Sequence, residues 1–369
     1  MRHLSHGSES LSRPRSRSDD LSAALLADVR GDVSRRGLAA LVVLCAVLPA
    51  WQAGKIEGAV ESVQAPTVRV EKLIRTRRDL GRGGLLRRIT GRPDPEIFHR
   101  PYGVAWDGDD LLVTDPGSSR VVRIGIKGRI SSSPQDAFES PMGVAVCGEG
   151  VVVTDSRRGR VELLDQRLRP VRRLAEDLDR PTGVACDPTH VFVVETGGHR
   201  VLVFPLDGGA SERADAEQPR SIGSRGAAPG EFNFPTAIAF ADDSIWIGDT
   251  LNFRIQRFDV DGSTTVSAFG ELGDAPGEMP RIKGIAVDER SNLWVSDAHL
   301  DLLSLYRPDG RFLMSLGGNG SRAGEFSFPA GLATHPDGRV AVADSFNRRI
   351  QILRVVPAEK RGVAEEEKR

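Results

Sequence analysis

A single pattern recurs six times between Pro101 and Leu353, and it limits the possible fold more than any other feature. Each copy holds a Pro-x-Gly turn or a close variant, a short apolar run, and a second apolar run that ends in Asp or Glu. The Gly/Ala position of the turn recurs after 40, 40, 54, 47 and 47 residues, at Gly103, Gly143, Gly183, Ala237, Gly284 and Gly331. A period of this length, built from strand–turn–strand units, is typical of radial repeats whose small sheets stack around an axis. We therefore expect an all-β, six-bladed propeller of four-stranded blades.

The two ends of the repeat region indicate how the ring closes. The sixth copy stops after its third strand, near Val356, and lacks a fourth strand of its own. Upstream of the first copy, residues 85–91 read Leu-Leu-Arg-Arg-Ile-Thr-Gly. We expect this N-terminal strand to complete the last blade and to hide the edges of an otherwise open ring. The propeller is thus predicted over residues 85–356, and truncation before about residue 85 is expected to be tolerated.

The residues outside the ring divide into four segments. Residues 1–34 are rich in Ser, Arg and Asp and are expected to be disordered. Residues 35–54 begin with paired Arg and continue in an apolar run to Trp51, the shape of a signal peptide or a membrane anchor. Residues 55–84 are predicted to be a polar linker, and residues 357–369 a charged, disordered tail. Because the basic residues precede the apolar run, the propeller is expected outside the cytoplasm, membrane-anchored or secreted.

Charge and cysteine content narrow the range of functions. Residues 85–356 carry 32 Lys and Arg against 38 Asp and Glu, which disfavours nucleic-acid binding through a concentrated positive surface. The three cysteines are too few for a disulfide framework. Cys147 and Cys186 lie one residue out of phase in the repeat, so strand alternation is expected to point them to opposite faces. We expect buried, unpaired thiols rather than a bridge.

The repeat resembles the NHL family. The match, a Phe-x-x-Pro start followed by an acid, an Asn and Arg-Ile-Gln, is fullest at residues 232–258 and 326–353. The Gly- and Glu-containing stretches that precede these segments are similar to those of the same family. The resemblance covers all six copies and implies a six-bladed propeller. Relatives include RNA-binding and protein-binding modules, sensor domains and a lyase, and similar folds include metal-dependent lactonases, so the fold does not decide the function.

Acidic and basic residues recur at fixed places in the copies. The acids that end the second strands are Asp115, Asp155, Glu195, Asp249, Asp297 and Asp344, and the Arg residues five positions later are Arg120, Arg160, Arg200, Arg254 and Arg349. Features that repeat in five or six copies are usually architectural. We therefore interpret each acid as an acceptor of backbone N–H bonds and each Arg as a brace for a loop or carboxylate.

Residues that do not repeat are the better candidates for ligand binding. The loops between second and third strands and the turns between blades are expected on one face of the ring. Its candidate residues are Arg157, Arg158, His199, Phe253, His299, Asp301 and Arg348 from the loops, and Tyr102, Met142, Thr182, Thr236, Lys283 and Ala330 from the turns beside the channel.

No cofactor is expected, although Ca or Zn in the central channel stays an alternative. Asp288 and His335 occupy the same slot at the end of the first strand in their copies, and they are the candidate metal ligands. His199 and His299 are expected on the opposite face from His335, so one site holding all three is disfavoured. No nucleophile elbow, phosphate loop or paired-Cys motif is present in the sequence, and catalytic residues are not assigned.

The leading interpretation is an exported, membrane-tethered binding or scaffold module with a monomeric propeller. Its partner would be a protein, a glycan or a small molecule. The alternative is a metal-dependent enzyme, a lactonase or a lyase, that uses the central channel. A third is RNA binding through a local basic face.

Overall fold

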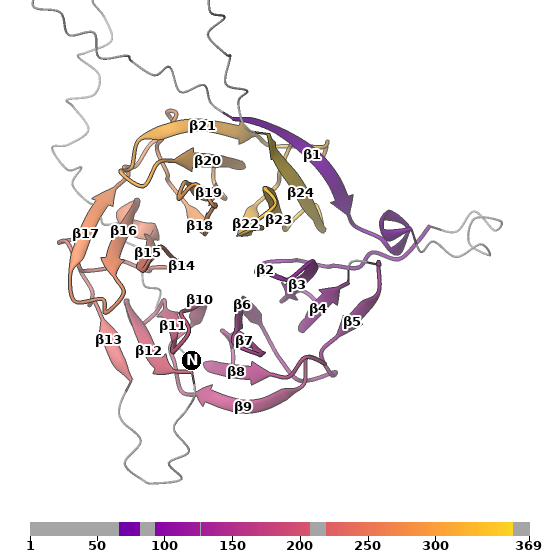
Figure 1. Ribbon diagram of the computed structural model, residues 1–369, viewed down its shortest axis with the longest axis horizontal. Helices are drawn as coiled ribbons and strands as arrows, with labels where there is room; N and C mark the ends of the chain where they lie inside the picture. Colours follow the sequence, from indigo (N-terminus) through magenta and orange to yellow (C-terminus); the bar gives the residue numbers. More distant parts are fainter. Residues whose placement is uncertain (1–65, 82–92, 126, 207–218, 357–369) are drawn as a thin grey trace, which may run out of the picture. The chain divides into compact units, whose positions relative to one another are not determined.

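The computed structural model describes residues 66–81, 93–125, 127–206 and 219–356, all within a compact unit that runs from Val63 to Arg369. The described residues form six antiparallel sheets of four strands each, arranged as blades around a central axis (Figure 1). The predicted all-β, six-bladed propeller of four-stranded blades is confirmed.

Successive strands run outward from the axis in five of the six blades. Blade 1 is β2 (Val104–Asp107), β3 (Asp110–Asp115), β4 (Arg120–Ile124) and β5 (Ile130–Ser132); blade 2 is β6 (Pro141–Cys147), β7 (Gly150–Asp155), β8 (Arg160–Leu164) and β9 (Pro170–Ala175); blade 3 is β10 (Pro181–Cys186), β11 (His190–Glu195), β12 (Arg200–Pro205) and β13 (Arg220–Ile222).

The second half of the ring repeats this order, with one difference in its last blade. Blade 4 is β14 (Ala237–Ala241), β15 (Ser244–Asp249), the 3-10 helix η2 (Thr250–Asn252), β16 (Arg254–Asp259) and β17 (Thr265–Phe269); blade 5 is β18 (Ile282–Val287), β19 (Leu293–Asp297), β20 (Leu302–Tyr306) and β21 (Phe312–Gly317); blade 6 is β22 (Pro329–Thr334), β23 (Arg339–Asp344), β24 (Arg349–Val356) and, outermost, β1 (Thr67–Ile74).

The core lies between the blades. Six clusters of buried apolar side chains are present, one at each interface between neighbouring blades. In β3, Leu111 and Val113 join the cluster shared with blade 6, whereas Leu112 between them joins the cluster shared with blade 2. Side chains alternate across a strand, and an inner strand has a blade on each side. The second strand of each repeat is therefore apolar at nearly every position.

Blade 6 is closed by β1, not by residues 85–91. Strand β1 pairs antiparallel with β24, from Thr67 opposite Val356 to Ile74 opposite Ile350. The prediction that residues 85–91 form this strand was wrong. An outermost strand is half-exposed, so β1 mixes apolar and charged residues and its sequence resembles that of a polar linker. Its Val68 and Val70 pack on the cluster between blades 5 and 6, and its Ile74 is buried between blades 6 and 1.

This pairing moves the start of the propeller upstream. Residues 82–92 lie outside the described residues, and the strand predicted at 85–91 falls among them. The 3-10 helix η1 (Arg77–Leu80) follows β1 and leads the chain toward blade 1. Truncation at residue 85 would remove β1, so the expectation that it is tolerated is withdrawn.

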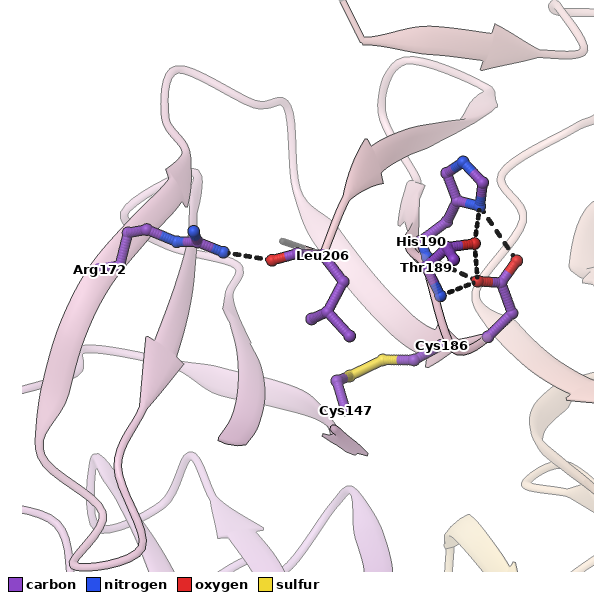
Figure 2. Close-up of a disulfide and its surroundings, with 7 residues drawn as sticks. Cys147, Arg172, Cys186, Thr189, His190 and Leu206 are labelled. Carbon is purple, nitrogen blue, oxygen red and sulfur yellow. Dashed lines mark hydrogen bonds and ion pairs between the residues drawn. A yellow bond between two sulfur atoms is a disulfide. The ribbon is translucent and has the colours of Figure 1, made fainter. Parts of the chain in front are cut away.

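A disulfide joins Cys147 at the end of β6 to Cys186 at the end of β10, with their Cα atoms 5.7 Å apart (Figure 2). This overturns the expectation of unpaired thiols. The reasoning from alternation failed because neighbouring blades face each other with opposite surfaces. Residues one position out of phase are therefore the ones that meet across an interface. Both cysteines pack into the cluster between blades 2 and 3.

The bridge is supported by a polar contact at the same interface. Arg172 of β9 donates a 2.6 Å hydrogen bond to the carbonyl of Leu206, which follows β12 (Figure 2). Blades 2 and 3 are thus linked covalently near the axis and by a hydrogen bond farther out.

The predicted disordered region 1–34, the apolar segment 35–54 and the charged tail 357–369 lie outside the described residues. In the part of the chain that the structure describes, no helix is long and apolar enough to cross a membrane.

Candidate binding site at the channel mouth

The turns that begin the blades surround one end of the central channel. We call these six segments the inner turns: residues 100–103, 140–143, 180–183, 234–237, 281–284 and 328–331. They line a cavity of about 80 Å³, which we call the channel mouth. Of the candidates chosen from the turns, Tyr102, Met142, Thr182, Thr236 and Lys283 line this cavity, whereas Ala330 is fully buried beside it.

In blades 1 and 2 the glycine of the inner turn is required by the close approach of the next blade. A Cβ added to Gly103 would collide with the carbonyl oxygen of Met142, and one added to Gly143 with that of Thr182. Only glycine lets a neighbouring backbone come this close. The glycine of the repeat thus keeps the channel mouth narrow.

A ring of buried hydroxyl groups fixes the inner turns, and the sequence analysis did not find it. One Ser or Thr beside the acid of each second strand donates a hydrogen bond of 2.5–3.3 Å to a carbonyl in the inner turn of the next blade. The pairs are Thr114 to Met142, Thr154 to Thr182, Thr196 to Pro235, Thr250 to Ile282, Ser296 to Ala330, and Ser345 to Pro101. The signal was a hydroxyl residue adjacent to every acid.

The acids themselves hold the loops that lead into the inner turns. All six are buried, and each accepts a backbone N–H bond of 2.6–2.9 Å from the segment just before its own first strand. The repeat arginines are less uniform. Arg200, Arg254 and Arg349 form ion pairs with the acid of their own blade, at 2.6, 2.9 and 2.7 Å. Arg120 donates instead to the Ile97 carbonyl, and in the described residues Arg160 makes no ion pair.

Three of the loop candidates make contacts that support the fold. Arg158 donates to the carbonyls of Asp136 and Ala137. His199 is 7% exposed, and its Nδ1 accepts a hydrogen bond from the Phe234 N–H. Asp301 accepts the Phe328 N–H at 2.6 Å. His199 and Asp301 thus hold the inner turns that begin at residues 234 and 328, whereas Arg158 holds the loop that precedes β6.

The other loop candidates are more accessible. Arg157 pairs with Glu139 at 3.1 Å and Arg348 with Glu96 at 3.0 Å, but both arginine side chains are more than half exposed. His299 is exposed, and Phe253 ends η2 with a left-handed φ of 56°. These residues surround the channel mouth at a distance, since they belong to the outer loops of the same face.

Aromatic side chains on this face were missed by the sequence analysis. Phe234 and Phe328 precede the Pro of two inner turns and have φ values of 49° and 55°, which bulky residues rarely adopt. The ring of Phe328 stacks on that of Phe346, which is 56% exposed, and the Arg100 guanidinium lies over Phe346. An exposed stack of this kind offers a flat apolar surface beside the mouth.

Lys283, in the inner turn of blade 5, is the cationic residue that lines the cavity. Burial, together with the charge of Arg281, lowers the pKa of Lys283 to about 8, while Asp297 opposes the shift. The Asp297 carboxylate is occupied by the backbone N–H groups of Arg281 and His299. Across the mouth, burial raises the pKa of Tyr102 to about 12. In the described structure, Lys283 makes no ion pair or hydrogen bond through its ammonium.

The candidate metal ligands lie at the other end of the channel. Asp288 and His335 border a cavity of about 250 Å³ formed by the turns between first and second strands. Asp288 accepts bonds from Asn292 and the Trp294 indole, and His335 contacts Asp337 at 2.9 Å. Within the described residues, no three His, Cys, Asp or Glu side chains group as metal ligands. His199 and His299 lie in loops of the opposite face.

Comparison with protein families agrees with this architecture. The NHL repeat model matches residues 326–353, one of the two segments with the fullest motif. The chain carries an NHL repeat in a six-bladed propeller. No curated protein matches the sequence of this NHL propeller.

Solved structures of several activities share the NHL propeller's fold. An auxiliary nutrient binding protein from Bacteroides thetaiotaomicron is 11% identical, with 71% of each chain covered and a TM-score of 0.56. A gluconolactonase from Xanthomonas campestris is 14% identical, with 70% of this chain and 86% of that chain covered and a TM-score of 0.52. A catalytically inactive virginiamycin B lyase from Staphylococcus aureus, solved with quinupristin, is 13% identical, with 71% and 83% covered and a TM-score of 0.51. At these identities the likeness concerns the fold alone.

Proposed function

We propose that this NHL propeller is an extracytoplasmic binding module that takes a ligand at the channel mouth. The observation that carries the proposal is that the backbone and the side chains of the inner turns have different roles. Their carbonyls are occupied by the hydroxyl ring, whereas the side chains of Tyr102, Met142 and Lys283 face the cavity. A rigid frame that leaves a few side chains of different chemistry around one hollow suits ligand recognition.

The disulfide supports a place outside the cytoplasm. Disulfides persist in oxidising compartments and are rare where thiols are kept reduced. The basic residues followed by an apolar run in residues 35–54 point the same way. A test is thiol trapping of the full chain in bacterial cells. We expect Cys147 and Cys186 to be oxidised in the full chain and reduced when residues 1–54 are deleted. Reduced thiols in the full chain would contradict export.

Ligand binding can be tested with a screen that reports where a ligand sits. Residues 63–369 would be screened by thermal shift against small molecules, glycans and short peptides. Each hit would be retested on Met142→Trp, which fills the channel mouth. The control is Glu289→Trp, which adds the same side chain to an exposed turn at the other end of the channel.

Binding that is lost in Met142→Trp and kept in Glu289→Trp supports the proposal. Ligands that bind both variants as they bind the wild type would place recognition away from the mouth and overturn it.

A further inference from the structure

The inner turns carry four cationic residues and no carboxylate on the face around the channel mouth, and one of the four, Lys283, lines the mouth itself. Each inner turn has a Pro, or Ile282 in blade 5, at its second position. In blade order, the two residues that flank it are Arg100 and Tyr102, Ser140 and Met142, Arg180 and Thr182, Phe234 and Thr236, Arg281 and Lys283, and Phe328 and Ala330. These twelve positions hold four cations, Arg100, Arg180, Arg281 and Lys283, and no carboxylate. The two cations of blade 5 are only two residues apart.

Among the described residues, the acids of this face form no ion pair with the blade 5 cations. Asp297, the acid of the same blade, is 2% exposed and accepts three backbone N–H bonds, from Arg281, His299 and Leu300. Glu139 pairs with Arg157, and Asp179 lies 3.5 Å from Arg180. In the described part of the chain, neither Arg281 nor Lys283 has an ion-pair partner. Two like charges are thus held together beside a hollow, an arrangement that a bound anion would stabilise.

The size of the hollow limits what can enter it. One water needs about 10–15 Å³ of such volume, so the mouth, at about 80 Å³, has room for a group of a few atoms and not for a whole sugar or side-chain cluster. The remainder of a ligand would lie on the surrounding face, beside Phe328 and Phe346.

We propose that the channel mouth binds the carboxylate or phosphate group of a small ligand, with Lys283 and Arg281 as the counter-charges. This rests on the proposed function and adds the chemistry of the ligand to it. The Lys283 ammonium donates to the anion from inside the mouth, and the Arg281 guanidinium approaches from the exposed rim.

Anion binding of this kind depends on pH. The charged and titratable groups that face Lys283 are Arg281 and Asp297 of its own blade and Tyr102 across the mouth. The lowered pKa of Lys283, about 8, and the raised pKa of Tyr102, about 12, leave Lys283 as the described mouth residue that changes charge near pH 8. An anion favours the ammonium form. Affinity should therefore be constant below about pH 8 and should fall as the pH rises through it.

The experiment reads Lys283 directly. It is one of six lysines in the chain, so after reductive ¹³C-methylation of residues 63–369 its NMR signal can be assigned with Lys283→Arg. The pKa of each methylated lysine is then measured with acetate, with inorganic phosphate and with chloride at equal ionic strength. We expect acetate or phosphate to raise the pKa of Lys283 saturably by about half a unit or more, and chloride to leave it unchanged. The arm that responds identifies the anion as carboxylate or phosphate.

Two variants complete the test. Arg281→Gln should weaken the responding anion about tenfold. Arg290→Gln, which removes a positive charge from an exposed turn at the other end of blade 5, should leave its affinity unchanged. No saturable shift with either anion, or equal shifts at other lysines, would overturn the inference. If the screen still yields a neutral ligand that Met142→Trp abolishes, the proposed function stands and the anion inference alone fails.

Discussion

Ser345 makes the hydroxyl contact that joins the two ends of the ring. Its hydroxyl is fully buried and donates a 2.6 Å hydrogen bond to the Pro101 carbonyl in blade 1. Removing one partner of a buried hydrogen bond leaves the other without water, at a cost of about 1–3 kcal/mol. We therefore expect Ser345→Ala to lower the free energy of unfolding by about that amount, measured by urea denaturation. The control is Ser131→Ala, on exposed β5, which should change it by less than about 0.5 kcal/mol. Equal effects would show that the hydroxyl ring is not stabilising.

Lys283 should lower the stability of the protein that contains it. Its folded-state pKa of about 8 lies below the usual value of 10.5, so the unfolded chain binds more protons between these values. The penalty is then fully present below about pH 8 and is relieved as the pH rises toward 10. We expect Lys283→Met to raise the free energy of unfolding at pH 7 by at most about 3 kcal/mol, with a smaller gain at pH 10. A loss of stability at pH 7 would contradict a desolvated ammonium.

At the scale of elements, β1 is the strand of the propeller that is hardest to predict from the sequence. Its apolar residues alternate with charged ones, and its partner β24 lies almost the whole chain away. A local pattern cannot reveal such a pairing. The strands near the axis are easier to recognise, because both of their faces are buried and their sequences are therefore continuously apolar. The hydroxyl ring was also not predicted, because the Ser or Thr stands before the acid in some blades and after it in others, and its acceptor lies in the next blade.

The boundary of the propeller can be tested by truncation. A chain that begins at residue 63 keeps β1, and we expect it to stay monomeric with an unchanged melting temperature. A chain that begins at residue 82 loses β1 and η1, exposes the edge of β24, and uncovers the clusters at both interfaces of blade 6. We expect it to aggregate or to melt at least 10 °C lower, as judged by light scattering and circular dichroism. Equal behaviour of the two chains would return the fourth strand to residues 85–91.

The disulfide is a second testable element. It closes a loop across 39 residues, and loop-closure entropy gives it at most about 4 kcal/mol. We expect the double variant Cys147→Ser/Cys186→Ser of residues 63–369 to lose about 2–4 kcal/mol of unfolding free energy. Dithiothreitol should lower the stability of the wild type by a similar amount and leave the variant unchanged. A reducing agent that acts equally on both would argue against the bridge.

For the whole molecule, the six similar interfaces predict that the closed ring unfolds as one unit. Trp106, Trp246 and Trp294 lie in blades 1, 4 and 5, so single-Trp variants report on separate parts of the ring. We expect their urea midpoints to coincide with each other and with the circular dichroism transition. Without β1 the ring is open, and repeat arrays with open ends lose cooperativity. The midpoints should then separate, with Trp106 unfolding first because blade 1 adjoins the opened blade.

At this scale the sequence was informative about architecture and poor on the site. The period gave six blades because each repeat must bury two faces. The face that holds the channel mouth was also foreseen, since Tyr102, Met142 and Lys283 follow from their place in the turn. Arg281 and the Phe328–Phe346 stack were not, because Arg281 acts through the burial of Lys283, and the two rings of the stack come from separate loops of blade 6 that only the fold brings together.

Closure by β1 also determines when, during synthesis of the chain, the ring can be completed. Strand β1 is synthesised before the other strands of the propeller, whereas its partner β24 is synthesised after them. At a synthesis rate of about 5–20 residues per second, β1 waits roughly 15–60 s for it. Throughout that interval blades 1 to 5 can assemble while the edge that β1 will cover does not yet exist. The closed ring can therefore form only after β24 has been synthesised, and any step that keeps β1 apart until then controls when the ring closes.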